Sequence, residues 1–294
     1  MKCLLMLLTC LVSLLPLAAE VLPEQESAPI VVSQSPPVRY WRPANPGSTL
    51  VQTLPGLEHP LPVPKRRDPK LLVVLYHNIV FGRTGNIYNR DLYNFEHDLA
   101  YLKRNYTITN FAELAAIKPS TDVAIITFDD GDLSLYGIVY PLFRQYELEA
   151  TIFLVPNFIG QVGYMSWDQV REMSDYRTNA GKKLFHFESH SLTHRMMGSL
   201  SEDEIVQELK ESKARIEEQT ASPVTVLALP FGNGEGDARI ISAAKQLGYT
   251  AIRTSKPQSV LFALLNAWTI PALNVENYST DVFVQKALAL TGRN

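Results

Sequence analysis

Cysteine is almost absent from this 294-residue chain: both of its cysteines, Cys3 and Cys10, lie within the first ten residues. Beyond them no disulfide can form, and any metal site must be built from His, Asp or Glu. The net charge of −3 provides no general attraction for nucleic acid, so no nucleic-acid partner is expected. With 46% hydrophobic and 19% charged residues, the composition is globular and excludes disordered, collagen-like and multi-span membrane proteins.

The first 19 residues have the pattern of a secretory signal peptide. Lys2 precedes an apolar run from Cys3 to Ala19, which ends in small residues before Glu20. A positive start, an apolar stretch and small residues at its end are typical of such signals. An uncleaved membrane anchor is the alternative, although the run is shorter than the roughly 20 residues that cross a bilayer. We therefore expect export to the periplasm, cell surface or medium, with no lipid contact beyond such an anchor.

Proline sets residues 20–68 apart, because ten of the 19 prolines lie there. Each proline fixes φ and lacks an N–H donor, so neither a helix nor a sheet strand can persist. This segment is predicted to be an extended, polyproline-II-like linker. Residues 69–294 then form the folded domain.

From residue 69 onward, short apolar runs alternate with helical patterns. Buried strands are predicted at 71–76, 123–128, 150–155, 184–187, 224–229 and 249–252. Helices are predicted at 141–146, 167–173, 201–218 and 237–247, and around Phe95, Leu99 and Leu102. This alternation predicts an α/β domain with a parallel sheet, either open and doubly wound or closed as a barrel.

The strongest chemical signal is a pair of aspartates, Asp129 and Asp130, directly after a predicted strand in the sequence Thr-Phe-Asp-Asp-Gly. In parallel α/β folds, catalytic groups collect at this end of the strands. Adjacent carboxylates raise each other's pKa unless a bound cation compensates. The alternative is a solvated turn, because Asp-Asp-Gly is also common turn chemistry.

A second signal is the pair His190 and His194, which follows another predicted strand. If the chain turns helical there, a spacing of four residues places both imidazoles on one face. With a carboxylate from a neighbouring strand end, they make a two-histidine, one-carboxylate set that leaves positions open for water. Such a set suits Zn²⁺, with Co²⁺, Ni²⁺ or Mn²⁺ as alternatives.

These motifs resemble those of the polysaccharide deacetylase family, which shares the NodB homology domain, and in particular its exported branch acting on glucosamine polymers. The resemblance covers about residues 70 to 290. It includes three motifs of the family, at residues 127–131, 190–194 and 229–232. It implies a distorted (β/α)₇ barrel with parallel strands and outer helices, which binds one divalent metal.

The resemblance also implies residue roles. Asp130, His190 and His194 would bind the metal, most commonly Zn²⁺, and Asp129 would be the general base that takes a proton from the metal-activated water. A backbone N–H near Phe231 and Pro230 would stabilise the oxyanion. The implied reaction removes N-acetyl groups from an N-acetylated glycan, which leaves peptidoglycan, poly-N-acetylglucosamine and chitin-like polymers open as substrates.

Two departures from the family pattern stand out. Members usually carry an arginine two residues before the proline of the third motif, where this chain has Ala228. They also carry a late histidine that protonates the leaving amine, but no histidine here follows His194. His77, after the first predicted strand, is a candidate for that acid, with a structural histidine as the alternative. The departures keep two other functions open: a glycan-binding protein without activity, and a metal-dependent esterase or non-sugar amide hydrolase.

Three further residues are weaker candidates. His186 and Glu188 alternate with His190 along a predicted strand, so they are expected to point the same way and support the metal ligands. Trp167 is a candidate aromatic surface for a sugar ring. The sequence predicts no oligomeric state.

Overall fold

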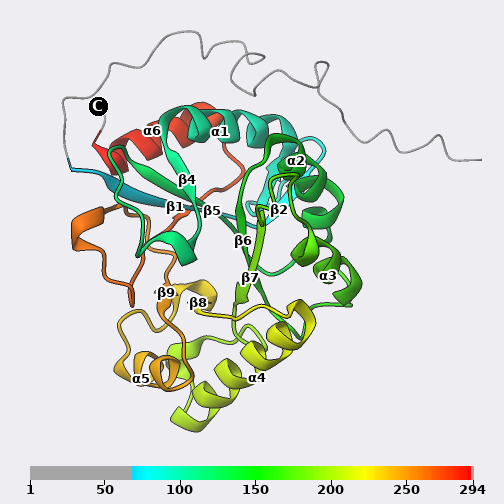
Figure 1. Ribbon diagram of the computed structural model, residues 1–294, viewed down its shortest axis with the longest axis vertical. Coiled ribbons are helices and arrows are strands. Elements are labelled where there is room, and N and C mark those ends of the chain that lie inside the picture. Colours follow the sequence, from blue (N-terminus) through cyan, green and yellow to red (C-terminus); the bar gives the residue numbers. More distant parts are fainter. Residues whose placement is uncertain (1–67, 293–294) are drawn as a thin grey trace, which may run out of the picture. The chain divides into compact units, whose positions relative to one another are not determined.

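The apolar run that opens the folded domain forms the first strand of a curled sheet (Figure 1). In the computed structural model, which describes residues 68–292, β1 (Lys70–Tyr76) pairs in parallel with β5 (Val123–Phe128). Every residue of β5 is buried, as are all residues of β1 except Lys70. Such continuous apolar runs are typical of parallel strands that are covered on both faces.

The main sheet has nine strands among the described residues, in the order β10-β1-β5-β6-β7-β8-β9, with β4 paired to β5 and β11 paired to β1. All pairings are parallel except that of β1 with β10. The remaining strands are β4 (Thr107–Thr109), β6 (Ala150–Leu154), β7 (Phe185–Ser189), β8 (Val226–Ala228), β9 (Ala251–Arg253), β10 (Val260–Leu261) and β11 (Leu273–Asn274). A separate small sheet pairs β2 (Asn78–Val80) with β3 (Asn89–Asp91).

A short segment, residues 270–274, links the two ends of the curled sheet. Its first residue, Ile270, bridges in parallel to Arg253 of β9. Its last two residues, β11, pair in parallel with Val74 and Leu75 of β1. The sheet therefore curls as expected for a distorted (β/α)₇ barrel, and the predicted fold class is confirmed.

Helices cover the outer face of the sheet (Figure 1). They are α1 (Leu92–Asn105), α2 (Tyr140–Tyr146), α3 (Trp167–Asp175), α4 (Glu202–Thr220), α5 (Ala238–Gln246) and α6 (Thr280–Thr291). Shorter 3₁₀ turns lie at Phe111–Glu113, Met197–Ser199, Pro230–Gly232 and Phe262–Leu264, and a π-helical turn, Leu135–Val139, precedes α2. A capping box starts α4, where Ser201 and Glu204 each accept the other's backbone N–H. The sequence analysis assigns no helix to α6.

Two apolar cores follow from the alternation of side chains along the strands. The inner core is formed mainly by every second strand residue, and its members include Leu71, Val73, Leu75, Val123, Ile125, Phe153, Val226, Ala228, Ala251, Ile270 and Ala272. The outer core, between sheet and helices, takes the intervening residues, such as Leu72 and Val74 of β1. The next inward-facing position after the core residues lies two residues further along a strand, at its carboxyl end. These positions bring polar side chains to that edge of the sheet.

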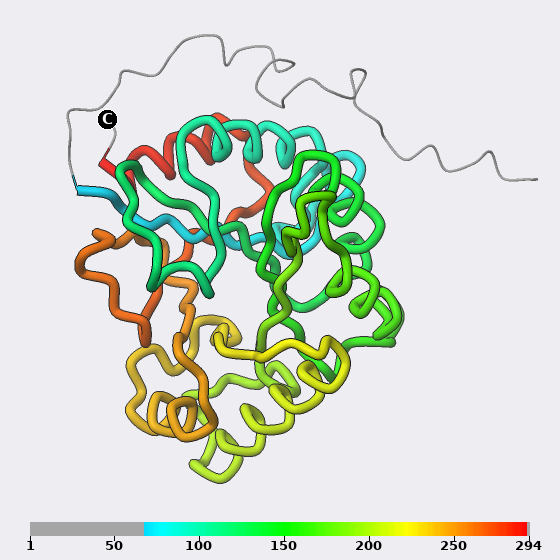
Figure 2. The backbone as a smooth tube through the Cα atoms, viewed as in Figure 1, coloured from blue at the N-terminus to red at the C-terminus, as the bar shows by residue number. Residues whose placement is uncertain are grey.

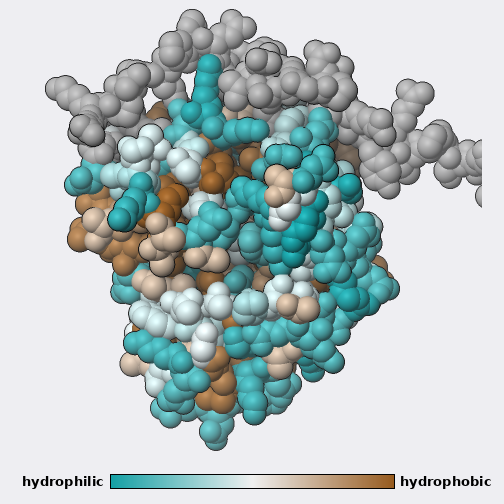
Figure 3. Space-filling model, in the orientation of Figure 1, coloured by the Kyte–Doolittle hydropathy of each residue, from teal (hydrophilic) through white to brown (hydrophobic). Residues whose placement is uncertain are grey.

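The first described strand and the last helix lie side by side (Figure 2). Lys70 Nζ donates a hydrogen bond of 3.3 Å to the carbonyl oxygen of Leu290. Apolar residues gather on the left of Figure 3, where the segment 260–265 runs in Figure 1 and Leu264 is 70% exposed. Among the helices of residues 68–292, none is both long and apolar enough to cross a membrane. The predicted signal, 1–19, and the predicted linker, 20–68, lie outside the described residues except for Asp68.

Candidate active site and metal centre

A cavity of about 380 Å³ opens at the carboxyl ends of the strands. Its lining includes Asp129 and Asp130 after β5, His190 and His194 after β7, and Arg253 at the end of β9. Four of these five residues were predicted from motifs that lie about 60 residues apart in the sequence. The parallel register of β5, β6 and β7 brings them to one edge of the sheet.

Three side chains in the cavity converge on one point. Asp130 Oδ1 lies 3.6 Å from His190 Nε2 and 3.4 Å from His194 Nε2, and the two Nε2 atoms are 3.2 Å apart. Within residues 68–292, they form a group whose ligand atoms all lie within 4.8 Å of one another. That spacing suits simultaneous contact with a single ion.

The chemistry of these three atoms fits a divalent cation. Asp130 Oδ1 is buried and has no hydrogen-bond partner among the described residues. Burial, together with the charge of Asp129, raises the pKa of Asp130 to about 6. His190 Nδ1 lies 2.9 Å from the carbonyl oxygen of Ala228, which can only accept, so Nδ1 carries the proton and the lone pair of Nε2 faces Asp130. Burial lowers the pKa of His190 to about 3, so the imidazole is neutral at pH 7, as a ligand must be.

The segment that carries the two histidines is a loop, so the helical turn that the sequence analysis considers as one way to align them does not form. Ser191 and His194 both have φ of 63°, in the left-handed region. The backbone N–H groups of Leu192 and Thr193 donate to the carboxylate of Glu208 on α4, at 2.8 and 2.9 Å. The loop's N–H groups are thus satisfied by a side chain, and two left-handed residues bring the imidazoles together.

Backbone strain is concentrated in this cavity. Six non-glycine residues of the described chain have positive φ, and two of them, Glu147 and Ala221, are C-caps of helices. The other four are Asp130, Ser191, His194 and Phe231, all in the metal-site and third-motif segments. Left-handed backbone costs of order 1–3 kcal/mol per non-glycine residue and is commonly stored at functional sites. The surrounding fold therefore holds these four residues in conformations that they would not adopt alone.

Asp129 lies beside the three candidate ligands but has a different environment. It is 2% exposed, and its Oδ1 and Oδ2 each lie 2.5 Å from Arg253 Nη2. Its Oδ2 is also 3.3 Å from His190 Nε2. Burial acts to raise the pKa of Asp129, but the charge of Arg253, with smaller contributions from the histidines, outweighs it and lowers the pKa. Asp129 is therefore ionised at neutral pH.

Arg253 is the residue of the site that the sequence analysis misses. The predicted strand ends at Ile252, one residue too early. Ala251 belongs to the inner core, so alternation along β9 directs Arg253 to the same face. A buried arginine on the inner face of a sheet requires a buried acidic partner. This requirement is the sequence signal that could have identified Arg253 as a residue of the site.

His77 follows β1 and lines the cavity, where the sequence analysis places it. Its ring centroid lies 4.8 Å from that of Tyr88. Its Nδ1 is buried and has no hydrogen-bond partner among residues 68–292. A role as proton donor therefore stays a prediction that its position allows.

Phe231 and Pro230, from the third motif, occupy different places. Phe231 is 61% exposed, and its ring centroid lies 4.6 Å from that of His194, so it forms part of the cavity mouth. Pro230 is buried and begins a 3₁₀ turn behind it. Stabilisation of an oxyanion from this turn stays a prediction.

Three predicted site residues are corrected by their contacts. Trp167 begins α3 and packs against the outer core. His186 Nε2 lies 3.6 Å from Glu149, while Glu188 accepts hydrogen bonds from the backbone N–H groups at the start of β8. Since a strand rises about 3.3 Å per residue, residues two and four positions before His190 lie well below the rim. None of the three is among the lining residues of the cavity.

The lining also includes polar and aromatic residues that belong to no recognised motif. They are Asn78, Asn86, Tyr88, Asp132, Tyr164, Ser255 and Asn274. Most lie in loops, where no periodic pattern marks them. Together they give the cavity the mix of hydrogen-bonding groups and ring surfaces that a polar ligand requires.

Comparison with known proteins agrees with the fold and with the resemblance that the motifs carry. Residues 116–252 match the model of a family described as polysaccharide deacetylase. The chain is 26% identical to "Putative polysaccharide deacetylase YxkH" of Bacillus subtilis (strain 168), over 65% of this chain and 66% of that protein. It is 27% identical to the poly-beta-1,6-N-acetyl-D-glucosamine N-deacetylase of Staphylococcus aureus (strain MRSA252), over 36% of this chain and 39% of that protein. The chain thus aligns with less than two thirds of the length of either relative.

A solved structure shares the fold. The deacetylase PplD of Streptococcus pyogenes, in complex with acetate, superposes with a TM-score of 0.65 at 19% sequence identity. The match covers 75% of this chain and 99% of that one. Fold and site thus define a parallel barrel with a histidine- and aspartate-lined cavity. The family whose model matches residues 116–252 is the one that the motifs of this chain resemble, so the predicted resemblance is confirmed.

Proposed function

We propose that this chain is an exported, metal-dependent N-deacetylase of an amino-sugar polymer. The observation that carries the proposal is the convergence of Asp130, His190 and His194 on one point, with an ionised Asp129 beside them. The relative from Staphylococcus aureus favours poly-β-1,6-N-acetylglucosamine as the polymer, ahead of peptidoglycan and chitin-like chains. Export is part of the proposal because of the apolar run from Cys3 to Ala19.

The reaction joins a water to an acetamide. Asp130, His190 and His194 would hold a divalent cation, which would supply Lewis-acid chemistry for a water and a carbonyl oxygen. Asp129 accepts the proton that the water loses as its oxygen forms a bond to the carbonyl carbon. The C–N bond then breaks as the nitrogen receives a proton, and the products are acetate and a free amine.

The amine needs a proton donor because an unprotonated amide nitrogen is a poor leaving group. His77 is the candidate, since it follows β1 and lines the same cavity as Asp129 and Asp130. Packing of its ring against Tyr88 restricts its orientation. No other histidine of the described chain lines the cavity except the two proposed ligands.

Replacing His77 by Gln is expected to affect substrates according to their leaving group. Release of acetate from N-acetylglucosamine oligomers should fall about 10²-fold or more, because positioned proton transfer contributes 10²–10⁴-fold. Hydrolysis of an aryl acetate, whose phenolate leaves without a proton, should fall less than about threefold. The control is His97→Gln, a half-buried histidine on α1 that does not line the cavity. Equal losses on both substrates would contradict the role of His77.

The proposed function is tested by measuring acetate released from acetylated glucosamine oligomers, poly-N-acetylglucosamine and peptidoglycan. Chelation is expected to abolish release, and added Zn²⁺, Co²⁺, Ni²⁺ or Mn²⁺ to restore it. His190→Ala should lose stoichiometric metal, whereas His97→Ala should keep it. Activity on aryl acetates alone would indicate an esterase. Stoichiometric metal with no hydrolysis by wild type on any substrate would indicate a glycan-binding protein.

A further inference from the structure

Arg253 has a geometry that a purely structural arginine does not need. It is 0% exposed, and its Nη2 donates to both carboxylate oxygens of Asp129 at 2.5 Å. Its Nε and Nη1 are buried and have no partner among the described residues, so Asp129 is the acceptor that this guanidinium has. The ring of Phe153 lies 5.0 Å from its Cζ. The side chain is thus enclosed by packing, with its charge directed at one carboxylate.

The strand register explains how this arginine reaches Asp129. Arg253 of β9 is paired directly with Ala228 of β8. Both face the inside of the sheet, because Ala228 and Ala251 belong to the inner core and side chains alternate along a strand. Neighbouring strands lie about 4.8 Å apart, so positions 228 and 253 are adjacent in one layer of the interior. The methyl group of Ala228 leaves this layer open for the long side chain of its neighbour.

We propose that Arg253 is the positioning residue for Asp129, and that β9 provides it in place of the arginine that members of the resembled family usually carry at the position of Ala228 on β8. The guanidinium holds the carboxylate beside His190, 3.3 Å from its Nε2, in the orientation that faces the cavity. This inference rests on the proposed function, in which Asp129 takes the proton of the attacking water. With Arg253 in this role, the lack of an arginine at position 228 no longer favours an inactive, glycan-binding protein.

The first test compares Arg253→Ala and Arg253→Lys with wild type in the full chain loaded with Zn²⁺. We expect kcat to fall about 10²-fold in Arg253→Ala, because a misplacement of 1 Å at a catalytic group costs that much. For Arg253→Lys we expect a loss of about tenfold or more, since the lysine side chain is one bond shorter and cannot place its ammonium where Nη2 lies. KM and bound Zn²⁺ should stay within about twofold of wild type, because neither substrate contacts nor metal ligands change.

The matched control is Arg90→Lys. Arg90 is also 0% exposed and paired with an aspartate, Asp98, but it does not line the cavity. Its replacement is expected to lower thermal stability and to leave kcat within about threefold of wild type. A general effect of disturbing a buried arginine would lower kcat in both variants, which would overturn the proposal.

The decisive variant moves the arginine from β9 to the paired position on β8. Ala228→Arg combined with Arg253→Ala is expected to recover at least about tenfold of the kcat lost in Arg253→Ala, because position 228 lies in the same layer. A folded, Zn²⁺-loaded double variant no more active than Arg253→Ala would overturn the proposal, as would wild-type kcat in Arg253→Ala. If the double variant does not fold, Arg253→Lys decides, since wild-type kcat there also overturns it.

The test separates this inference from the proposed function. Every variant is also assayed on an aryl acetate, whose hydrolysis requires the same attack of water but no sugar. If the wild-type protein cleaves the aryl acetate but no N-acetylated glycan, the proposed function is wrong. The ratios of kcat between the variants on the aryl acetate still measure the effect of Arg253 on Asp129.

Discussion

Replacing Asp129 by Asn is expected to lower kcat for acetate release by about 10²–10⁴-fold, the contribution of a positioned general base. An amide has nearly the shape of a carboxylate but cannot accept the proton that water loses. Arg253 remains beside the new side chain, whose carbonyl oxygen still accepts from Nη2. KM and metal content should therefore change little, and the loss should lie in kcat. Steady-state kinetics and metal analysis of the purified variant measure both.

The adjacent aspartate provides the comparison for this prediction. Asp130→Asn is expected to lose stoichiometric metal as well as activity, because Asp130 contributes one of the three converging ligand atoms. Asp129→Asn should keep the metal. Equal loss of metal in the two variants would mean that both aspartates bind it, and would contradict the separate role of Asp129. Wild-type kcat in Asp129→Asn would contradict it as well.

Much of the fold could be predicted because its central strands are buried on both faces. The mainly apolar runs at β1, β5 and β6 were found almost to the residue, since no charged residue interrupts them. Several of the short strands escaped prediction. Elements such as β2, β3 and β11, of two or three residues, contain too few positions for a periodic pattern, and their pairing depends on chain that is distant in the sequence.

The residues of the candidate site also divide into those that the sequence could predict and those that it could not. Asp129, Asp130, His190 and His194 could be predicted because each pair is local in sequence and carries chemistry that its neighbours do not share. Arg253 could not be assigned to Asp129, because their contact spans 124 residues and depends on the register of β8 with β9. The spacing of His190 and His194 allows a helical turn, but the segment between them is a loop. Its actual shape depends on Glu208, which lies on another element.

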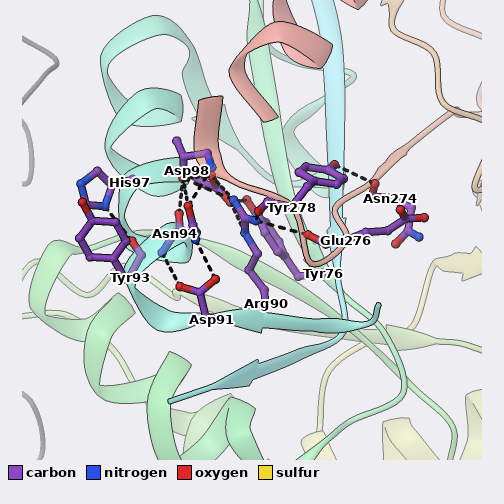
Figure 4. A network of polar contacts seen from close by, with 11 residues as sticks. Tyr76, Arg90, Asp91, Tyr93, Asn94, His97, Asp98, Asn274, Glu276 and Tyr278 are labelled. Atoms are coloured by element: carbon purple, nitrogen blue, oxygen red, sulfur yellow. Dashed lines mark hydrogen bonds and ion pairs between the residues drawn. The ribbon is translucent and has the colours of Figure 1, made fainter. Parts of the chain in front are cut away.

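A second buried arginine pair holds together the part of the fold that carries β1 and the last helix (Figure 4). Arg90 donates from Nε and Nη2 to the two carboxylate oxygens of Asp98, at 2.8 and 2.6 Å, and both side chains are 0% exposed. The hydroxyl groups of Tyr76 and Thr280 also donate to this carboxylate, at 3.2 and 2.8 Å. Arg90 Nη1 donates to the backbone carbonyl oxygen of Glu276. One ion pair thus connects β1, β3, α1, the chain after β11 and the start of α6.

Replacing Arg90 by Ala is therefore expected to lower the free energy of unfolding by about 3–5 kcal/mol, because Asp98 is left buried without its cation. In a domain of this size each kcal/mol shifts Tm by about 2–4 °C, so Tm should fall by about 6–20 °C. The control is Arg171→Ala, whose ion pair with Asp168 is exposed and should contribute about 1 kcal/mol or less. Thermal and urea unfolding measure both variants.

The double variant Arg90→Met with Asp98→Leu distinguishes the cost of an unpaired charge from the loss of a favourable contact. Since it leaves no buried charge without a partner, we expect it to be more stable than Arg90→Ala, although Tyr76 and Thr280 lose an acceptor. A double variant that is less stable than both single variants would show that the ion pair itself stabilises this part of the fold. In that case the network would contribute directly to stability, and the unpaired carboxylate would not be the main cause of the loss in Arg90→Ala.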